Sequence, residues 1–236
     1  MTPLVLVGAG GFARETAEAV AALNADGRQF EVLGFLDDDP ALAGQEVDGL
    51  PVLGPISDPV PAADRFAGAQ FVVCVGSPRR YSVRQAVVSA LALPDRRYAT
   101  IVHPTASLAR STVVGPGTVL LALTVTTASV RIGRHVAVMP HTVLTHDDVV
   151  EDFATLGAGV RLAGGVRVGR GAYIGAGALV REECAIGAWS LVGMGAVVTV
   201  DVPAGQVWTG VPARFRRTAS PGGRPDVTSP GGRLVP

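Results

Sequence analysis

The sequence contains no lysine, because all twenty of its basic residues are arginine, and it has only two cysteines in 236 residues. The absence of lysine excludes Schiff-base catalysis and the phosphate-binding lysine of a P-loop. Cys74 and Cys184 are too few for a disulfide framework or a cysteine-rich metal cluster, so we expect a reducing compartment and no metal. Twenty acidic residues balance the arginines, so no net charge directs the protein to nucleic acid or an anionic membrane.

A membrane-spanning hydrophobic run is also missing. The longest uncharged stretch, Ser111–Val130, could span a bilayer by length, but it contains Pro116, two glycines and many hydroxyl side chains. The apolar N-terminal residues 1–11 lack a positively charged start and end in glycines, which predicts a buried strand rather than a signal peptide. We therefore expect no membrane span.

A six-residue repeat organises residues 102–198. Sixteen of the seventeen residues at position 102 and every sixth position after it are valine, leucine or isoleucine, and Thr126 is the exception. Four positions later, fifteen of sixteen residues are Ala, Ser, Thr, Val or Cys, and Asp148 is the exception. A period of six fits neither a helix nor a simple strand. It predicts a coil of short parallel strands, with aliphatic side chains inside and a corner every six residues.

Strands and helices alternate before the repeat, which is typical of a parallel sheet. We expect strands at 4–7, 32–36 and 71–75, and helices at 14–23 and about 79–91. Glycines 8, 10 and 11 follow the first strand, where backbone amides can approach a phosphate. Acidic residues after the second strand can accept hydrogen bonds from a ribose. The residues alone leave three interpretations open: nucleotide-sugar binding, NAD binding, or a structural turn.

The repeat and its closing segment, Gly210-Val211-Pro212-Ala213-Arg214, resemble the hexapeptide-repeat acyltransferases, whose fold is a left-handed parallel β-helix. With the N-terminal half, the chain resembles the bacterial sugar acyltransferases of the PglD/NeuD type. The resemblance implies a Rossmann-like α/β nucleotide-sugar-binding domain over residues 1–100 and a left-handed β-helix of about five coils over 101–217. It also implies a homotrimer with coenzyme A between neighbouring β-helices. The composition of residues 218–236 predicts a disordered tail.

The same resemblance carries binding roles to individual residues. The nucleotide sugar would contact Gly10, Gly11, Phe12, Asp37, Asp38 and Gly76. Acetyl-CoA, as co-substrate, would contact Thr155, Ala176 and Met194. Phe12 and Thr155 stand where some relatives have histidine, so side-chain contacts at these two positions differ from the family pattern.

The catalytic residues follow from chemistry and resemblance together. Transfer of an acyl group requires a base to remove a proton from the attacking amine or hydroxyl, and imidazole titrates near neutral pH. By the resemblance, His146 is the general base, Asp147 raises its basicity, and the backbone amide of Gly164 binds the oxyanion. Asp148 is the alternative partner of His146.

The other three histidines have different expected roles. His141 is the alternative base, although we favour a polar surface residue or a contact between subunits. We expect His135 at an exposed turn, and His103 as a cap or hinge at the domain junction.

Together these features predict a cytoplasmic acyltransferase of polysaccharide biosynthesis. We expect it to transfer an acetyl group from acetyl-CoA to the amine of a nucleotide-linked amino sugar, by direct attack on the thioester. Three alternatives remain open at this point: a sugar O-acetyltransferase of the sialic-acid type, a non-catalytic trimeric scaffold, and an NAD-dependent enzyme. The residues do not identify the sugar, the nucleotide or the physiological acyl group.

Overall fold

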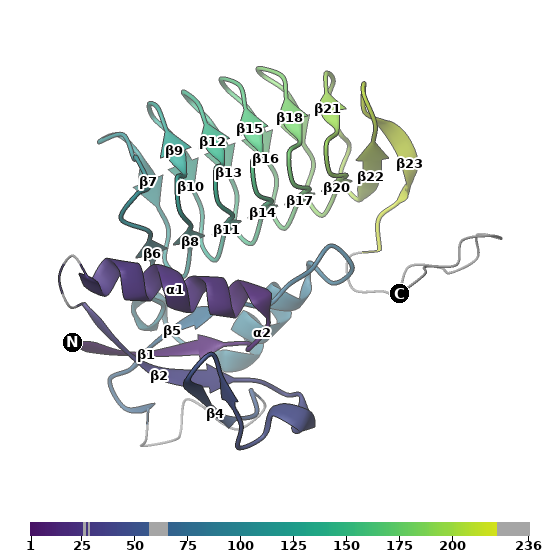
Figure 1. Cartoon of the computed structure of the whole chain (residues 1–236). Helices are drawn as coiled ribbons and strands as arrows, with labels where there is room; N and C mark the ends of the chain where they lie inside the picture. Colours follow the sequence, from purple (N-terminus) through teal and green to yellow (C-terminus); the bar gives the residue numbers. More distant parts are fainter. Residues whose placement is uncertain (26, 28, 57–65, 221–236) are drawn as a thin grey trace.

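The computed structural model describes residues 1–25, 27, 29–56 and 66–220 of the chain. A small α/β domain is followed along the chain by a long β-solenoid, and the domain lies against one side of the first coils (Figure 1). This architecture confirms the predicted fold class, a Rossmann-like α/β domain followed by a left-handed parallel β-helix.

Five strands form the sheet of the α/β domain, in the order β3-β4-β2-β1-β5. They are β1 (Thr2–Val7), β2 (Phe30–Leu36), β3 (Glu46–Val47), β4 (Leu50–Gly54) and β5 (Gln70–Val73). All neighbouring pairs are parallel except β3 with β4. The sequence predicts β1, β2 and β5, although β5 ends two residues early, and misses β3 and β4, which are short and interrupted by turn residues.

Two helices and two short 3₁₀ turns complete this domain. They are α1 (Gly11–Ala25), α2 (Val83–Leu91), η1 (Pro40–Leu42) and η4 (Asp95–Arg97). Helix α1 packs with Leu4 and Leu6 on one face of the sheet, while α2 packs with Val5 and Val7 on the other. Because both faces are covered, the central strand consists almost entirely of apolar residues. The expected helix at about 79–91 begins later, at Val83, because the residues before it form turns.

Two-residue strands recur through the solenoid. They are β6 (Ile101–Val102), β7 (Val113–Val114), β8 (Val119–Leu120), β9 (Val125–Thr126), β10 (Arg131–Ile132), β11 (Ala137–Val138), β12 (Val143–Leu144), β13 (Val149–Val150), β14 (Thr155–Leu156), β15 (Arg161–Leu162), β16 (Arg167–Val168), β17 (Tyr173–Ile174), β18 (Leu179–Val180), β19 (Ala185–Ile186), β20 (Leu191–Val192) and β21 (Val197–Val198). Each strand from β6 to β18 pairs in parallel with the strand eighteen residues ahead, as Leu144 pairs with Leu162. Three hexads therefore make one coil, as the resemblance to the left-handed β-helices implies.

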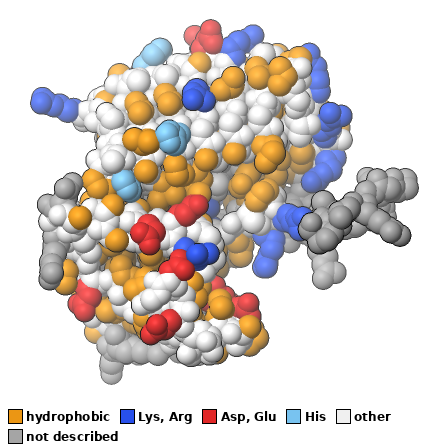
Figure 2. Space-filling view, viewed as in Figure 1, with side chains coloured by type: hydrophobic (Ala, Val, Ile, Leu, Met, Phe, Trp, Pro, Cys, Tyr) orange, Lys and Arg blue, Asp and Glu red, His pale blue; other side chains and the backbone are white. Residues whose placement is uncertain are grey.

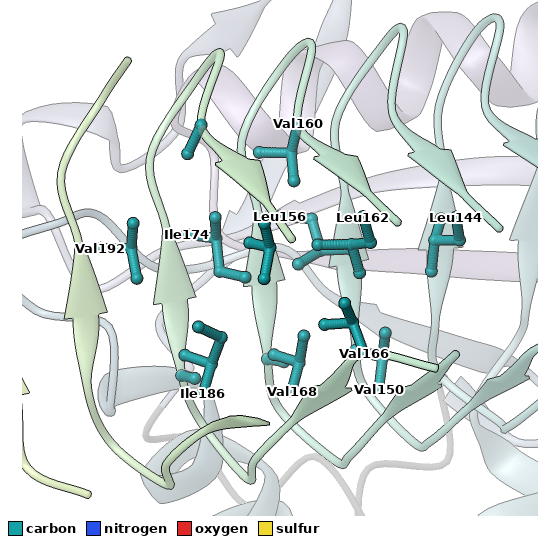
Figure 3. Close-up of a cluster of buried hydrophobic side chains, with 14 of the residues drawn as sticks. Leu144, Val150, Leu156, Val160, Leu162, Val166, Val168, Ile174, Ile186 and Val192 are labelled. Carbon is teal, nitrogen blue, oxygen red and sulfur yellow. The ribbon is translucent and has the colours of Figure 1, made fainter. Parts of the chain in front are cut away.

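The pairing builds three sheets. The first contains β7, β10, β13, β16 and β19, the third contains β9, β12, β15, β18 and β21, and the second contains β6, β8, β11, β14, β17 and β20. The aliphatic residue of each hexad points inward and stacks on its copies in neighbouring coils, as Leu156, Ile174 and Val192 show in Figure 3. Adjacent coils approach closely: a Cβ added to Gly157 would lie 2.6 Å from the Ala176 nitrogen, which explains the glycine at this position.

The second sheet continues into β22 (Gln206–Thr209) and the antiparallel strand β23 (Arg214–Thr218). Strand β23 is exposed along its length, and arginines gather at this end of the solenoid (Figure 2). The predicted tail begins at 218, yet Thr218 is the last residue of β23 and the Ala219 amide donates to Gly205. Residues 221–236, on which the prediction of disorder mainly falls, lie outside the described part of the chain.

Arg84 joins the two regions of the molecule. Its side chain is only 2% exposed, and within the described residues it forms no ion pair. The guanidinium donates to the backbone oxygens of Val75, His135 and Ala154 and to the Thr155 hydroxyl, the last at 2.8 Å. Burial lowers the pKa of Arg84 to about 10, so the side chain is charged at neutral pH. Because Val75 belongs to the α/β domain and the others to the solenoid, Arg84 fixes one against the other.

His135 corrects an expectation. The sequence predicts an exposed turn, but His135 is 3% exposed, since it stacks on Phe153 at 5.2 Å and meets Tyr98 edge-on at 4.5 Å between ring centroids. Tyr98 comes from the segment that links the two regions, so the burial depends on contacts distant in sequence. Burial, aided by Arg84, lowers the pKa of His135 to about 4.

Substitution of Arg84 by alanine tests the junction. Arg84→Ala leaves buried oxygens without donors, and each such group typically costs about 1–3 kcal/mol. We expect the free energy of unfolding, measured by urea titration, to fall by about 3 kcal/mol or more. Arg80→Ala, at an exposed turn position, is the matched control and should leave the stability unchanged. Equal stability of the two variants would contradict the role assigned to Arg84.

His135 makes the junction sensitive to acid. Because its folded pKa lies below the unfolded value, its contribution to stability is present above pH 6.5 and is lost as the pH falls towards 4. We expect His135→Phe to flatten the dependence of unfolding free energy on pH over this window. Phenylalanine tolerates the backbone here, since Phe153 adopts the same left-handed conformation one coil later. His141→Asn, at an exposed position, should leave the pH dependence unchanged; an equally steep curve for His135→Phe would refute the assignment.

Candidate active site

His146 and Asp147 lie at the corner that joins β12 to β13. Corners of this kind stack along the solenoid, and residues 128–129, 146–147 and 164–165 form successive members, which we name the upper corners after their place in Figure 1. The Asp147 amide donates to Ala128 and the Gly165 amide to His146, each at 2.9 Å. The α/β domain packs against the second sheet, on the opposite side of the solenoid (Figure 1). The upper corners are therefore remote from the α/β domain of their own chain.

The two side chains at this corner contact each other. Nδ1 of His146 lies 3.0 Å from a carboxylate oxygen of Asp147, and both side chains are about two-thirds exposed, at 66% and 68%. Adjacent residues of a strand point apart, but Asp147 adopts a left-handed conformation (φ 63°), which aspartate tolerates and which folds its carboxylate back towards the ring. With the Nδ1 proton shared with Asp147, Nε2 carries the lone pair that a general base needs.

Gly164 lies one coil above His146, against its imidazole. A Cβ added to Gly164 would overlap the ring, so the absence of a side chain is what allows the imidazole to lie against this corner. The Gly164 carbonyl accepts from the Glu183 amide at 2.9 Å. No acceptor for the Gly164 amide is found among the described residues. An imidazole and a backbone amide with no acceptor among the described residues therefore lie side by side at the upper corners.

Asp148 points into the solenoid instead of towards His146. It is fully buried, and its two carboxylate oxygens accept from the amides of Thr145 and Val166, each at 2.8 Å. Burial raises the pKa of Asp148 to about 7. The carboxylate within hydrogen-bond distance of the His146 ring is therefore that of Asp147.

His141 and His103 lie at other corners. His141 is exposed at the corner between β11 and β12, in a different row from His146. His103 caps a turn, since its Nδ1 accepts from the Thr105 amide at 3.1 Å, as a residue at the domain junction was expected to do. It also lines a cleft of about 390 Å³ with Glu15 and Glu18 of α1.

The three residues expected at acetyl-CoA separate into two groups. Thr155 is only 8% exposed and its hydroxyl accepts from Arg84, so its side chain is engaged at the junction with the α/β domain; this counts against contact with coenzyme A. Ala176 and Met194 are exposed at successive corners that follow β17 and β20, with Met194 at 79%. The third sheet separates this row of corners from the upper corners.

The expected nucleotide-binding residues gather where β1, β2 and β5 end at the same edge of the sheet. Gly10 and Gly11 are exposed, with open space where a Cβ would stand. Asp37 holds the loops at this edge, because its oxygens accept from the amides of Ala9 at 2.7 Å and Asp39 at 2.9 Å. One acceptor site on each oxygen therefore holds a backbone amide, so Asp37 shapes this edge of the sheet.

The remaining members of this group lie around the same edge. An oxygen of Asp38 accepts from the Ile56 amide at 2.8 Å. Phe12 lies beneath the Arg84 guanidinium, 5.6 Å from the ring centroid, and a Cβ at Gly76 would stand 3.2 Å from the same guanidinium. The edge of the sheet that would hold the nucleotide is thus connected to the solenoid through Arg84.

Several other kinds of site were sought across the described residues. No group of three or more His, Cys, Asp and Glu side chains there is arranged to hold a metal ion. None of the described helices has the length and apolar character needed to cross a membrane. Cys74 and Cys184 are buried, and burial raises the pKa of the Cys74 thiol to about 12, which disfavours the thiolate needed for an acyl-enzyme.

Two comparisons of sequence detect related proteins. The family model described as the PglD N-terminal domain matches residues 3–91. The acyl-[acyl-carrier-protein]--UDP-N-acetylglucosamine O-acyltransferase of Pseudomonas aeruginosa is 36% identical over 89 residues. That match covers 38% of this chain and 34% of the relative, so the chain spans about a third of the length of the curated relatives it matches.

Solved structures resemble nearly the whole chain. The acetyltransferase domain of PglB from Neisseria gonorrhoeae is 29% identical, with a TM-score of 0.79, over 92% of this chain and 100% of that one. It has also been solved with acetyl coenzyme A. PerB from Caulobacter crescentus, in complex with CoA and GDP-perosamine, is 30% identical, with a TM-score of 0.78, over 92% of this chain and 98% of its own. A variant of the perosamine N-acetyltransferase of that organism has a TM-score of 0.79 at 29% identity.

Proposed function

Because the chain belongs to the hexapeptide-repeat sugar acyltransferases of the PglD/NeuD type, we propose that it transfers an acetyl group from acetyl-CoA to the amine of a nucleotide-linked amino sugar. The chain is an acyltransferase and acetyl-CoA is its co-substrate. The observation that carries the finer proposal is the His146–Asp147 pair, exposed at an upper corner and lying against Gly164. An amine acceptor is favoured by the similarity to an N-acetyltransferase solved with GDP-perosamine.

In the proposed reaction, Nε2 of His146 takes a proton from the amine as its nitrogen attacks the thioester carbonyl. A carbon–nitrogen bond forms, and the carbonyl oxygen gains the negative charge, which the Gly164 amide stabilises. The intermediate then collapses, the carbon–sulfur bond breaks, and the CoA thiolate receives the proton from the imidazolium. Asp147 stabilises that imidazolium. A general base in such a position contributes about 10²- to 10⁴-fold to the rate.

The site is proposed to form between neighbouring chains of a homotrimer. Ala176 and Met194, which would contact the CoA arm, stand at a different row of corners from His146, with the third sheet between them. The outward residues of that sheet are mostly apolar, and Leu179 among them is 40% exposed. A second solenoid packed on this face would bury the apolar residues and bring one chain's Ala176 and Met194 towards the other's His146.

The α/β domain is proposed to hold the nucleotide of the acceptor. The exposed Gly10 and Gly11 stand at the start of α1, where backbone amides and the helix dipole favour phosphate. We keep residues 1–100 as the proposed nucleotide-sugar-binding domain and 101–217 as the acyltransferase domain, with Asp38 and Gly76 at the edge of the nucleotide site. A cytoplasmic location and a place in polysaccharide biosynthesis complete the proposal.

A hydroxyl acceptor is the second candidate. The observation that favours it is the match of 89 residues to the O-acyltransferases, and the same base would remove a proton from a hydroxyl as from an amine. A panel of nucleotide-linked amino sugars and their hydroxyl analogues, assayed by release of the CoA thiol, distinguishes the two acceptors. Turnover only with the hydroxyl analogues would overturn the proposal of an amine acceptor.

Substitution of His146 tests the proposed base. We expect His146→Ala to lower kcat with acetyl-CoA and the accepted amino-sugar nucleotide by at least about 10²-fold, because the substitution removes the imidazole that takes the proton. His141→Ala removes the alternative base, and its kcat should stay far above that of His146→Ala. Wild-type turnover of His146→Ala would end the assignment.

Substitution of Gly10 tests the proposed nucleotide site. A Cβ atom at Gly10 meets nothing within 4 Å in the free protein, so the melting temperature without ligand should change little in Gly10→Val. The valine side chain would occupy the approach of a phosphate to the start of α1. We expect the thermal shift produced by UDP-, GDP- or CMP-sugars, whichever the wild type binds, to be lost in Gly10→Val. A preserved shift would place the nucleotide elsewhere.

A further inference from the structure

Asp148 is the one residue that breaks the small-residue rule of the solenoid, and the function above does not use it. Residues at the equivalent position one coil before and one coil after are Val130 and Val166, both fully buried and apolar. Placing a carboxylate where the repeat places valine carries a large desolvation penalty. Such a departure from the pattern of the fold is expected where a residue serves function.

Most of the described corners elsewhere in the solenoid close in a common way, although the Val136 amide instead donates to the Thr118 hydroxyl one coil earlier. The amide at the small-residue position donates to the carbonyl oxygen three residues earlier, as from Ala172 to Gly169 at 3.0 Å and from Ala178 to Gly175 at 3.2 Å. Hydroxyl residues at this position strengthen the same turn, as when Ser190 donates to the carbonyl of Gly187.

Asp148 replaces this closure at two successive upper corners. The Val166 amide donates to one oxygen of Asp148 across the coils, in place of a bond to Ala163. The Thr145 amide donates to the other oxygen, which reverses the direction of the usual turn bond. A single buried carboxylate therefore sets the backbone that carries His146 and the backbone that carries Gly164.

We propose that Asp148 is a positioning residue, whose buried carboxylate clamps two neighbouring upper corners so that the His146 imidazole and the Gly164 amide face the same point. The inference rests on the proposed function, in which the His146 imidazole and the Gly164 amide act at the same reaction centre. It acts through the backbone, since Thr145 directly precedes His146 and Val166 follows Gly164 by two residues. Without the clamp, the two corners would lose the acceptor they share and could shift relative to each other.

The decisive variant is Asp148→Val, which restores the residue type of the neighbouring coils. We expect it to fold, with a melting temperature equal to or above that of the wild type, because a buried charge is replaced by an apolar side chain of similar size. We expect kcat for acetyl transfer to fall at least tenfold, while the KM for acetyl-CoA stays within about twofold. Asp148→Asn keeps one acceptor oxygen and should restore part of the lost kcat.

Two control experiments distinguish a positioning role of Asp148 from a role in stability alone. Ser190→Ala removes the polar group at the same register position of another row and should leave kcat unchanged. His146→Ala combined with Asp148→Val should lose less activity than the product of the two single losses, since part of the effect of Asp148 acts through His146. Losses that multiply in full would overturn the inference.

The remaining outcomes are also decisive. Full kcat in Asp148→Val, with His146→Ala inactive, would refute the clamp and leave the proposed function standing. Full activity of His146→Ala would instead refute the proposed function itself. If Asp148→Val does not fold, the folded Asp148→Asn variant decides: wild-type kcat would overturn the inference, and a lowered kcat with unchanged KM would support it.

Discussion

The stacking of backbone on backbone at intervals of eighteen residues is the constraint on which the rest of this molecule depends. Each strand of the solenoid donates to the strand one coil ahead, and glycines such as Gly157 stand where the coils approach too closely for a side chain. Every side chain of a hexad thereby acquires a fixed column of neighbours. A residue placed at a corner has a defined position relative to residues eighteen positions away, without a dedicated loop to hold it.

The proposed catalytic residues occupy such fixed positions, next to Asp148, where the small-residue rule of the repeat is broken. His146 and Gly164 are one coil apart in the same row, so the stacking of the coils itself brings the imidazole against the Gly164 backbone. Asp147 supplies the carboxylate because a left-handed corner residue folds back on its neighbour. The aliphatic interior gives these groups a rigid support, and the α/β domain, held by Arg84 on the far side, leaves the row of corners open.

The sequence was most informative where a single periodic rule decides the structure. The aliphatic and small-residue registers predicted the strands and the inward stacking, because each hexad depends only on its neighbours in the stack. It failed where contacts between distant segments decide the outcome. His135 is buried by Tyr98, and Thr155 is held by Arg84, and neither contact leaves a local signal. Asp148 was visible as an exception, but only the structure revealed which amides it holds.

The most direct test of the central claim is a crystal structure of the protein with coenzyme A and a nucleotide-linked amino sugar. The account predicts that the acceptor nitrogen lies within hydrogen-bond reach of His146 Nε2, at about 2.6–3.2 Å or through one water. It also predicts that the CoA sulfur lies beside the same upper corner, against a neighbouring solenoid. A complex with the sugar and the sulfur bound at any other corner, out of reach of the imidazole, would contradict it.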